Sequence, residues 1–461
     1  MGIESRLLML VVAATGLIAC SGGWDEAPPD GTPQGVAQRA DDHGSIHRGK
    51  HDFDHTLPHT NRRACATCHP AGDHFALLPA SVEARFQANP VDRLFDPLDA
   101  DDPIATQPTY EHLRRRGLIR LTLPLAPNLD LVDEAGNVIT NAARTISVWR
   151  GVPTIENTAL TAPYLFDGRA ATLQEQALGA LQAHSALTKS PAPHVLDDIA
   201  TFETTVFSSP GVQEVAEALA EGEPAPDPDP AFAPHSPEAQ GKAIFQQACA
   251  PCHGGATGNQ IVDRTVQDQF FPVLDANGTP ETVTLPDGTI VLHLSHDHPD
   301  DNFLDIGSSA LTYLTLVQPG QGGIPSGDGL DFPHYRLRFY TDGTRTHKVF
   351  DLPPKPPLIG PNFFPQAFTV DPGRAIITGD PADFEAFDVP QLRGISRTAP
   401  YFHDNSMPDL PALLDFYSRF ILGAIPPLGL PPVVPPAGPG LPPESLTAIQ
   451  KAQLLAYLQK I

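Results

Sequence analysis

The chain has 461 residues, a length typical of two or three domains that each bury a core of their own. Hydrophobic residues make up 41% of it, as in ordinary globular proteins, while 52 prolines and 37 glycines indicate many loops. With 54 acidic against 29 basic residues, the formal net charge of −25 repels nucleic acid and attracts basic protein partners. The composition therefore excludes a nucleic-acid-binding protein.

The first twenty residues predict an export signal. A short apolar run follows a single arginine, and it is too short to span a bilayer as an anchor. The run ends in Leu17-Ile-Ala-Cys20, which resembles the cleavage site of bacterial lipoproteins, where the cysteine becomes lipid-modified. An ordinary secretory signal with a chance cysteine is the alternative. Because Ser21 resembles the residue of lipoproteins sorted to the outer membrane, we expect an outer-membrane lipoprotein on the periplasmic side, with residues 21–42 as a flexible tether.

The other four cysteines form two pairs with the same spacing. They occur in Cys65-Ala-Thr-Cys68-His69 and Cys249-Ala-Pro-Cys252-His253. Each C-x-x-C-H sequence is typical of haem c attachment, because two thiols three residues apart on a helical turn reach the two vinyl groups of one porphyrin. The histidine that follows lies on the same face and predicts the proximal iron ligand. A four-cysteine zinc site is the alternative, but zinc pairs need no trailing histidine. The sequence thus predicts two covalently bound haem c groups.

The positions of these motifs and of the proline-rich segments predict two haem domains. Residues 43–220 form the expected N-terminal cytochrome c domain with haem 1, and residues 239–461 form the C-terminal one with haem 2. Residues 221–238 alternate proline with acidic and small residues and are expected to be a linker. Two hairpin-type turn signals indicate a β-rich insert at about 258–300. The predicted fold is mainly α, with two cytochrome c-type haem domains, long loops and a small β-rich insert in the second.

An internal repeat connects the two halves. Residues 152–173 align without gaps with residues 389–410. Each copy contains an Asp-Gly or Asp-Asn pair, residue types that tolerate a left-handed turn. A helix is expected to start after this turn, at Thr172 in the first copy and near Asp409 in the second. The chain therefore reads as a duplicated unit in which a turn and a helix pack over each haem.

The residues of this repeat carry a resemblance to a known family. The segments 166–179 and 371–404 resemble bacterial di-haem cytochrome c peroxidases, and 241–253 resembles the opening of a cytochrome c domain. The chain is identified as a member of the superfamily of these peroxidases and MauG. The resemblance implies two mostly helical cytochrome c folds, peroxide chemistry at haem 1, and electrons that pass through haem 2 from a small redox protein such as cytochrome c or a cupredoxin. Relatives often hold calcium between the domains.

The resemblance also assigns the iron ligands. His69 and His253 correspond to the proximal ligands of haem 1 and haem 2. The family's sixth ligand of haem 2 lies fourteen residues beyond the position of His403, which is Tyr417 here, as in the MauG type. Tyr417 also falls on an apolar helical stripe, so plain core packing is an alternative. Met407 is a second choice of ligand, at a position where the family has none.

Peroxide cleavage needs a group that moves a proton between the two oxygens. The family's glutamate in this role corresponds to Gln174, and Glu175 is its neighbour, although Glu175 also completes a helix-capping pattern with Thr172. The family's companion glutamine corresponds to Tyr164. Family members share His403 near the interhaem region, where its role is open. Gln174, Glu175, Tyr164 and His403 are thus the candidate catalytic residues.

Haem 1 is expected to have an open coordination position. Residues 75–93, which supply a distal histidine in peroxidases of this family, contain no histidine. Histidines do recur every fourth residue before the first motif, at His43, His47, His51, His55 and His59. Proline and Asp/Gly content favour a solvated loop there, with ligation by one of these residues or by His74 as an alternative.

The predicted function is the reduction of hydrogen peroxide at haem 1 with electrons relayed through haem 2. Two alternatives stay open at this point. The first is a di-haem cytochrome that only transfers electrons, because the candidate distal residues depart from the family's. The second is a MauG-type oxidase that uses peroxide to oxidise a protein partner.

Overall fold

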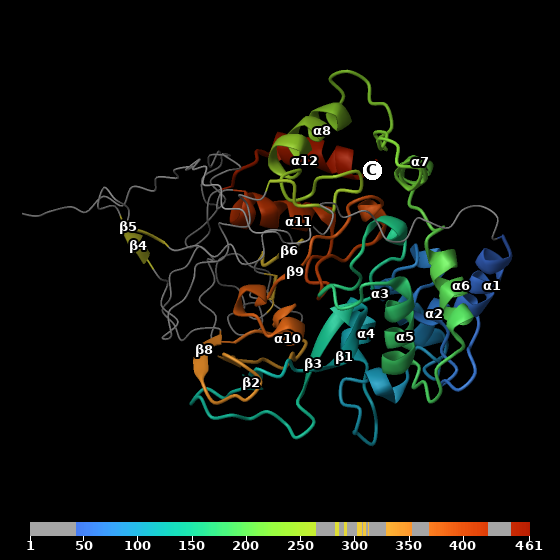
Figure 1. Cartoon of the computed structure of the whole chain (residues 1–461). Helices are drawn as coiled ribbons and strands as arrows, with labels where there is room; N and C mark the ends of the chain where they lie inside the picture. The colour runs from blue at the N-terminus through green and yellow to red at the C-terminus, as the bar shows by residue number, and fades with distance from the viewer. Residues whose placement is uncertain are drawn as a thin grey trace, which may run out of the picture.

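The computed structural model describes residues 43–263, 282–284, 290–292, 302–306, 308–309, 312, 329–352, 368–422 and 444–461. Figure 1 shows one helical region on the right of the view and another at the top, while the strands within residues 118–151 and 348–352 lie in the lower part of the view. The export signal, Cys20 and the tether lie outside the described residues, so these predictions stay predictions. None of the described helices combines the length and the apolar character needed to cross a membrane.

The first helical region is built around two packed helices, α1 (His43–Asp54) and α6 (Pro193–Glu203). The other helices of this half are α2 (Cys65–Cys68), α3 (Pro79–Ala88), α4 (Glu111–Arg116), α5 (Leu173–His184) and α7 (Pro210–Ala220). Short 3₁₀ helices cover Ala71–Asp73, Pro97–Asp99 and Thr158–Leu160. The first haem motif lies on α2, next to the α1–α6 pair.

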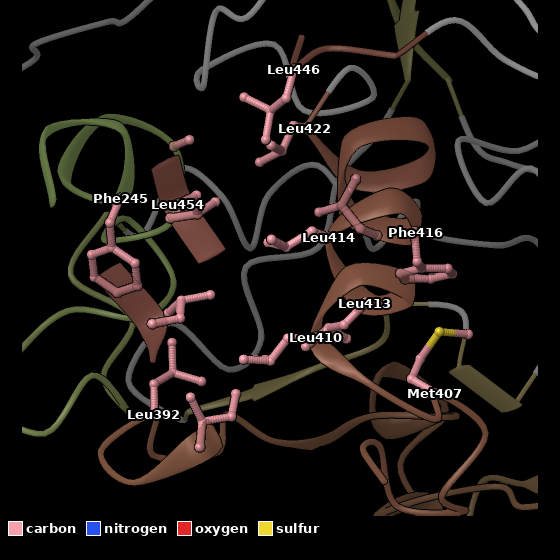
Figure 2. Close-up of a cluster of buried hydrophobic side chains, with 14 of the residues drawn as sticks. Phe245, Leu392, Met407, Leu410, Leu413, Leu414, Phe416, Leu422, Leu446 and Leu454 are labelled. Atoms are coloured by element: carbon pink, nitrogen blue, oxygen red, sulfur yellow. The ribbon is translucent and has the colours of Figure 1, made fainter. Parts of the chain in front are cut away.

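The second helical region repeats this arrangement with α8 (Pro237–Ala248) and α12 (Ala448–Leu458), which lie side by side at the top of Figure 1. It also contains α11 (Leu410–Phe416), a π-helix (Tyr417–Ile421) and a 3₁₀ helix at Ile395–Arg397. Helix α10 (Ala375–Thr378), next to a 3₁₀ helix at Pro381–Asp383, packs instead against strand β1 (Leu118–Pro124). Leucines and aromatic residues of α8, α11 and α12 form the core of this half (Figure 2).

Within the described residues, the strands form four small antiparallel sheets. They are β1 (Leu118–Pro124), β2 (Leu129–Leu131), β3 (Thr145–Gly151), β4 (Thr282–Thr284), β5 (Ile290–Leu292), β6 (Phe303–Leu304), β7 (Leu337–Tyr340), β8 (Lys348–Leu352) and β9 (Phe387–Asp388). The pairs are β1–β3, with Leu118 opposite Gly151, then β2–β7–β8, β4–β5 and β6–β9.

Strands are therefore not confined to the insert predicted at 258–300, which is a correction to the predicted fold. Within that range the structure describes the β4–β5 pair, whereas β1 and β3 lie in the first half. The sheet β2–β7–β8 takes strands from both halves. The reason is visible in β1, where apolar side chains alternate with Arg120 and Thr122, the period of a half-buried strand. Composition and turn signals alone did not reveal it.

The predicted histidine-rich loop is wrong, because His43, His47 and His51 lie on helix α1. Its buried residues, Ser45, Gly49 and Phe53, recur every fourth residue, a spacing that places them on one face against α6. The histidines share a different face and are exposed to solvent. Proline is no obstacle, since the helix ends at Asp54, before Pro58.

Close backbone contacts show that the two helix pairs are equivalent. A Cβ atom on Gly49 of α1 would lie 1.8 Å from the carbonyl oxygen of Asp198 on α6. A Cβ atom on Gly241 of α8 would lie 2.0 Å from the carbonyl oxygen of Gln453 on α12. Glycine is therefore required at both crossings, because each pair packs backbone to backbone at the same point.

The internal repeat is present in the structure. Tyr164 bridges to Ala170 in the first copy, and Tyr401 bridges to Met407 in the second. Each tyrosine hydroxyl donates a hydrogen bond to a backbone oxygen of the preceding 3₁₀ helix, at 3.1 Å and 2.8 Å. The two copies therefore fold alike.

Each of the two turns is followed by a helix, and the two helices start at equivalent positions of the repeat. Gly168 and Asn405 both have positive φ, which confirms the left-handed turn position. The side chain of Thr172 caps α5 and the side chain of Asp409 caps α11, as predicted. Positions counted from these caps can therefore be compared between the two halves.

Candidate haem-binding site

Both haem motifs line one continuous cavity of about 1390 Å³. Helix α2 and the loop after it bring Cys65, Cys68 and His69 to the cavity, and the segment after α8 brings Cys249, Cys252 and His253. Ligand pockets ordinarily measure about 300–1,000 Å³, so this cavity exceeds the size of a single small-molecule site. Its size and lining suit two porphyrins held in one interior.

The four cysteines suit thioether formation rather than metal ligation. All four are free thiols. Burial raises the pKa of Cys68 to about 11 and that of Cys249 and Cys252 to about 12, and it also raises the pKa of Cys65. Among the described residues, no three histidine, cysteine or acidic side chains are grouped to hold a metal ion. The four-cysteine zinc alternative is therefore wrong.

The two motif histidines are held in the tautomer that an iron ligand needs. His69 Nδ1 is 2.8 Å from the carbonyl oxygen of Phe75, and His253 Nδ1 is 3.1 Å from that of Gly258. An Nδ1–H that donates to a carbonyl leaves Nε2 unprotonated as the ligating atom. Burial lowers the pKa of His69, and it lowers the pKa of His253 to about 4, so both rings are neutral at pH 7.

The structure brings Tyr417 to the haem 2 end of the cavity and keeps Met407 away from it. Tyr417 lines the cavity, and its ring centroid lies 6.4 Å from that of His253. A π-helix starts at Tyr417, and such turns are frequent at functional sites. Met407 is buried in the core beside Leu410 and Phe416 and is not among the cavity-lining residues (Figure 2).

Comparison of the helices adds a residue that the sequence analysis missed. Eight positions after its cap, α11 leads into Tyr417, and eight positions after its cap α5 has Ala180. Both residues line the cavity. The haem 1 end therefore has a methyl group where the haem 2 end has a phenol. Extending the repeat alignment by one helical turn would have found this difference.

Three of the four candidate catalytic residues line the cavity, namely Tyr164, Glu175 and His403. Gln174 donates to Asp197 at 3.3 Å and does not line the cavity. Glu175 reaches the cavity edge, but its carboxylate accepts the backbone N–H of Ala171 at 2.9 Å and so closes the start of α5. Tyr164 does line the cavity, while its hydroxyl is bonded to the backbone. Gln174 therefore lies outside the cavity and Glu175 at its edge, and their acid–base roles stay predictions.

The candidate distal histidines also lie elsewhere. His43, His47, His51, His55, His59 and His74 are all absent from the cavity lining. His74 instead lies with Nδ1 3.5 Å from a carboxylate oxygen of Glu156. His184, at the end of α5, does line the cavity in this half, and its Nδ1 lies 3.0 Å from a carboxylate oxygen of Asp99.

His403 lies in a buried ionic network between the two motifs. Its ring stacks on Phe387 with centroids 3.9 Å apart, and its Nε2 lies 4.0 Å from Asp371. Asp371 in turn accepts two hydrogen bonds from Arg150, at 2.7 and 2.9 Å. Arg150 also donates to Asp167 of the first repeat at 2.6 Å. The network joins strand β3, both repeat turns and the cavity wall.

Two cytochrome c motifs that share one cavity define a di-haem cytochrome. Residues 52–221 match the family described as "Di-haem cytochrome c peroxidase", and residues 236–282 match the family "Cytochrome C oxidase, cbb3-type, subunit III". The match over residues 52–221 supports the resemblance to this superfamily that the sequence predicted. Both matches support haem cofactors, and the first supports an oxidoreductase.

Comparison with solved structures gives three similar chains. A MauG-like protein associated with microbial copper homeostasis is 16% identical, with coverage of 95% of each chain and a TM-score of 0.39. Hydrazine synthase of Kuenenia stuttgartiensis is 13% identical, covers 99% of this chain and 100% of its own, and has a TM-score of 0.38. The diheme peroxidase BthA of Burkholderia thailandensis is 15% identical, with coverage of 91% and 86% and a TM-score of 0.37. No curated protein matches the chain.

The positions of Tyr417 and Met407 give a spectroscopic prediction. If Tyr417 ligates the iron as predicted, replacing it by phenylalanine is expected to change the resting oxidised spectrum of haem 2, because the change removes the oxygen ligand. Replacing Met407 by leucine, a change of similar volume in the core, is expected to leave that spectrum unchanged. Absorption spectra of the oxidised holoprotein check both. A methionine-sulfur charge-transfer band in the wild type that Met407→Leu removes would contradict the assignment.

Proposed function

We propose that the protein reduces hydrogen peroxide to water at haem 1, with electrons entering through haem 2. The observation that carries this proposal is the pair Ala180 and Tyr417, which leaves room for a small substrate at the haem 1 end and fills the same position at the haem 2 end. In the overall reaction, peroxide takes up two electrons and two protons, its O–O bond breaks, and two water molecules form.

The chain's own residues would hold the cofactors as follows. Cys65 and Cys68 would bind haem 1 covalently, and Cys249 and Cys252 would bind haem 2. The imidazoles of His69 and His253 would ligate the two irons through Nε2, with Tyr417 as the second protein ligand of haem 2. When bound, the haems supply the redox chemistry. We also propose that the protein binds a calcium ion, as relatives do, and we assign no residues of this chain as its ligands.

The electron donor we propose is a small basic redox protein, a cytochrome c or a cupredoxin. The formal charge of −25 supports this, since opposite charges steer two proteins together and speed their encounter at low salt. We also propose that the protein works on the periplasmic side of the outer membrane, tethered through a lipid on Cys20. This rests on the sequence of its first twenty-one residues.

A second candidate function is favoured by one residue. The tyrosine at position 417 is the ligand type that the sequence analysis associates with MauG, whose peroxide chemistry oxidises another protein. A phenolate oxygen stabilises ferric iron more than a thioether does, which suits a centre that stores oxidising equivalents. The two functions differ in the electron source, which is a diffusing redox protein in one case and a residue of a protein substrate in the other.

The proposed reaction is tested by peroxide-dependent oxidation of reduced cytochrome c in the presence of the holoprotein. The wild type is expected to turn over. Ala180→Tyr is expected to lower the rate at least about tenfold. The introduced phenol would bind the iron of haem 1 in most molecules, and only the molecules in which the iron is free could react with peroxide. Ala180→Phe is the matched control, since it adds the same ring without the ligating oxygen and should retain the spectrum of an open haem. A wild type that leaves both peroxide and cytochrome c unchanged would contradict the proposal.

A further inference from the structure

Glu203, the last residue of α6, is a buried carboxyl group at the haem 1 end of the cavity. It is 3% exposed and lines the cavity. Its Oε2 atom is buried and has no hydrogen-bond partner among the described residues. Its neighbours in sequence and space, Phe202 and Ile199 among them, belong to an apolar cluster that packs against Cys65. Buried polar groups without a hydrogen-bond partner are rare in native proteins, so this carboxyl group calls for an explanation.

The other carboxyl groups that line the cavity all have partners. Glu156 accepts from Arg397 at 2.8 Å, Asp388 accepts from Asn302 at 3.0 Å, and Glu175 closes the start of α5. Glu203 is the one cavity-lining acid in the described part of the chain for which no side-chain partner is present. Glu203 alone among these carboxyl groups has no ion pair or hydrogen bond that offsets the cost of burying its charge.

The duplication of the fold shows what this position needs structurally. The glycine contacts described above place Phe202 of α6 and Tyr457 of α12 at equivalent positions, since their Cβ atoms lie 3.0 and 2.8 Å from the site of a Cβ on Gly49 and Gly241. The next residue is Glu203 in the first half and Leu458 in the second. Leu458 is 5% exposed and lines the same cavity at the haem 2 end.

An apolar residue therefore satisfies the packing at this position in the second half. The carboxyl group of Glu203 is specific to the haem 1 half, where the substrate is proposed to react. Its burial has a cost that a leucine would not have, because an unpaired polar group loses its hydration. The fold alone does not explain why the first half has an acid here.

The surroundings of Glu203 favour its protonated form. Burial raises its pKa to about 8, and no cation opposes the effect of burial. Two titratable groups interact with it, Cys65 of α2 and Tyr164 of the first repeat, and Asp54 at the end of α1 acts on the same thiol. Each of these groups is neutral or negative, so none stabilises a carboxylate. At pH 7 Glu203 is accordingly a neutral acid inside the cavity.

We propose that Glu203 is the proton-exchanging residue of the haem 1 cavity. This deepens the proposed function and rests on it. During peroxide reduction the carboxyl group gives one of the two protons, the second comes from water, and water then returns a proton to the carboxylate. The two electrons come from the small redox protein. Gln174, at the position of the family's acid, cannot serve in this way because an amide does not titrate.

The test uses the full-length protein with both haems and two variants. Glu203→Gln keeps the shape without the exchangeable acid, and Glu203→Leu introduces the residue of the equivalent position. In the wild type, infrared spectra are expected to show a protonated-carboxyl band that disappears as pH rises through about 8, and both variants should lack it. The rate of the peroxide reaction is expected to fall about 10²–10⁴-fold in both variants. Glu214→Gln, an exposed residue of α7, is the control and should keep the wild-type rate and band.

The outcomes separate this inference from the proposed function. A titrating band that persists in Glu203→Gln, or a wild-type peroxide rate in Glu203→Leu with full haem content, would overturn the role of Glu203 while peroxide reduction stands. A wild type that consumes no peroxide overturns the proposed function. In that case Glu203 is tested by measuring how the reduction of haem 1 depends on pH. If Glu203 exchanges a proton, this pH dependence is lost in Glu203→Leu. An equal pH dependence in the wild type and in Glu203→Leu overturns the role of Glu203.

Discussion

Serine in place of both Cys65 and Cys68 is expected to leave a protein with one haem instead of two and no peroxide reduction. Both thiols line the cavity at the haem 1 end, and both are free. A serine hydroxyl has nearly the shape of the thiol but does not add to a vinyl group, so the covalent link is lost while the packing is kept. Loss of this haem removes the proposed site of peroxide chemistry.

The matched control is the double replacement of Cys249 and Cys252 by serine, which should remove haem 2. Mass spectrometry of the denatured protein measures the covalent haem, with two groups expected in the wild type and one in each double variant. The first variant should lose the peroxide reaction, and the second should lose electron delivery from reduced cytochrome c. A wild-type protein that releases both haems on denaturation would contradict covalent attachment at these motifs.

Replacing Arg150 by alanine is expected to lower the free energy of unfolding by about 3–5 kcal/mol. Arg150 is 1% exposed and binds Asp371 and Asp167, both of which are also buried. Removal of the guanidinium leaves two buried carboxylates without their shared cation. Although burial alone raises the pKa of Asp167, the charges of Arg150 and Arg169 lower it below the usual value for aspartate. Its contribution to stability is therefore present above the pKa of unfolded aspartate and is lost as pH falls further.

The comparison for this variant is Arg169→Ala. Arg169 also pairs with Asp167, at 2.7 Å, but it is partly exposed, so its removal should cost only about 0–1 kcal/mol. Urea denaturation of the holoproteins at neutral and at acidic pH measures both values. Equal losses for Arg150→Ala and Arg169→Ala would show that the buried network does not carry the stability assigned to it.

The features that the sequence predicted well depend on residues close together in the chain. The two haem motifs, the repeat and the helix caps at Thr172 and Asp409 are local patterns with a direct physical meaning, and the structure contains them as expected. Tyr417 was predicted by counting fourteen residues from His403, and it does line the cavity, whereas its ligation of iron stays a prediction. Met407, the second choice of ligand, has no counterpart among the family's ligands, and it does not line the cavity.

The features that the sequence did not predict depend on contacts between distant segments. The histidines of α1 suggested a loop, because the burial of Ser45, Gly49 and Phe53 becomes clear only against α6. The sheet β2–β7–β8 joins strands about two hundred residues apart, a pairing that no local pattern contains. Glu203 has an unremarkable place in the sequence, and its isolation follows only from the cavity and the apolar side chains around it.

The most direct test of the central claim is a stopped-flow experiment in which the fully oxidised wild-type protein is mixed with hydrogen peroxide. If haem 1 is open beside Ala180 and haem 2 is closed by Tyr417, the haem absorption should change rapidly, with a rate proportional to peroxide concentration. Addition of reduced cytochrome c should then restore the resting spectrum. An oxidised protein whose spectrum is unaffected by peroxide, with two protein ligands on each iron, would contradict the claim and show a cytochrome that only transfers electrons.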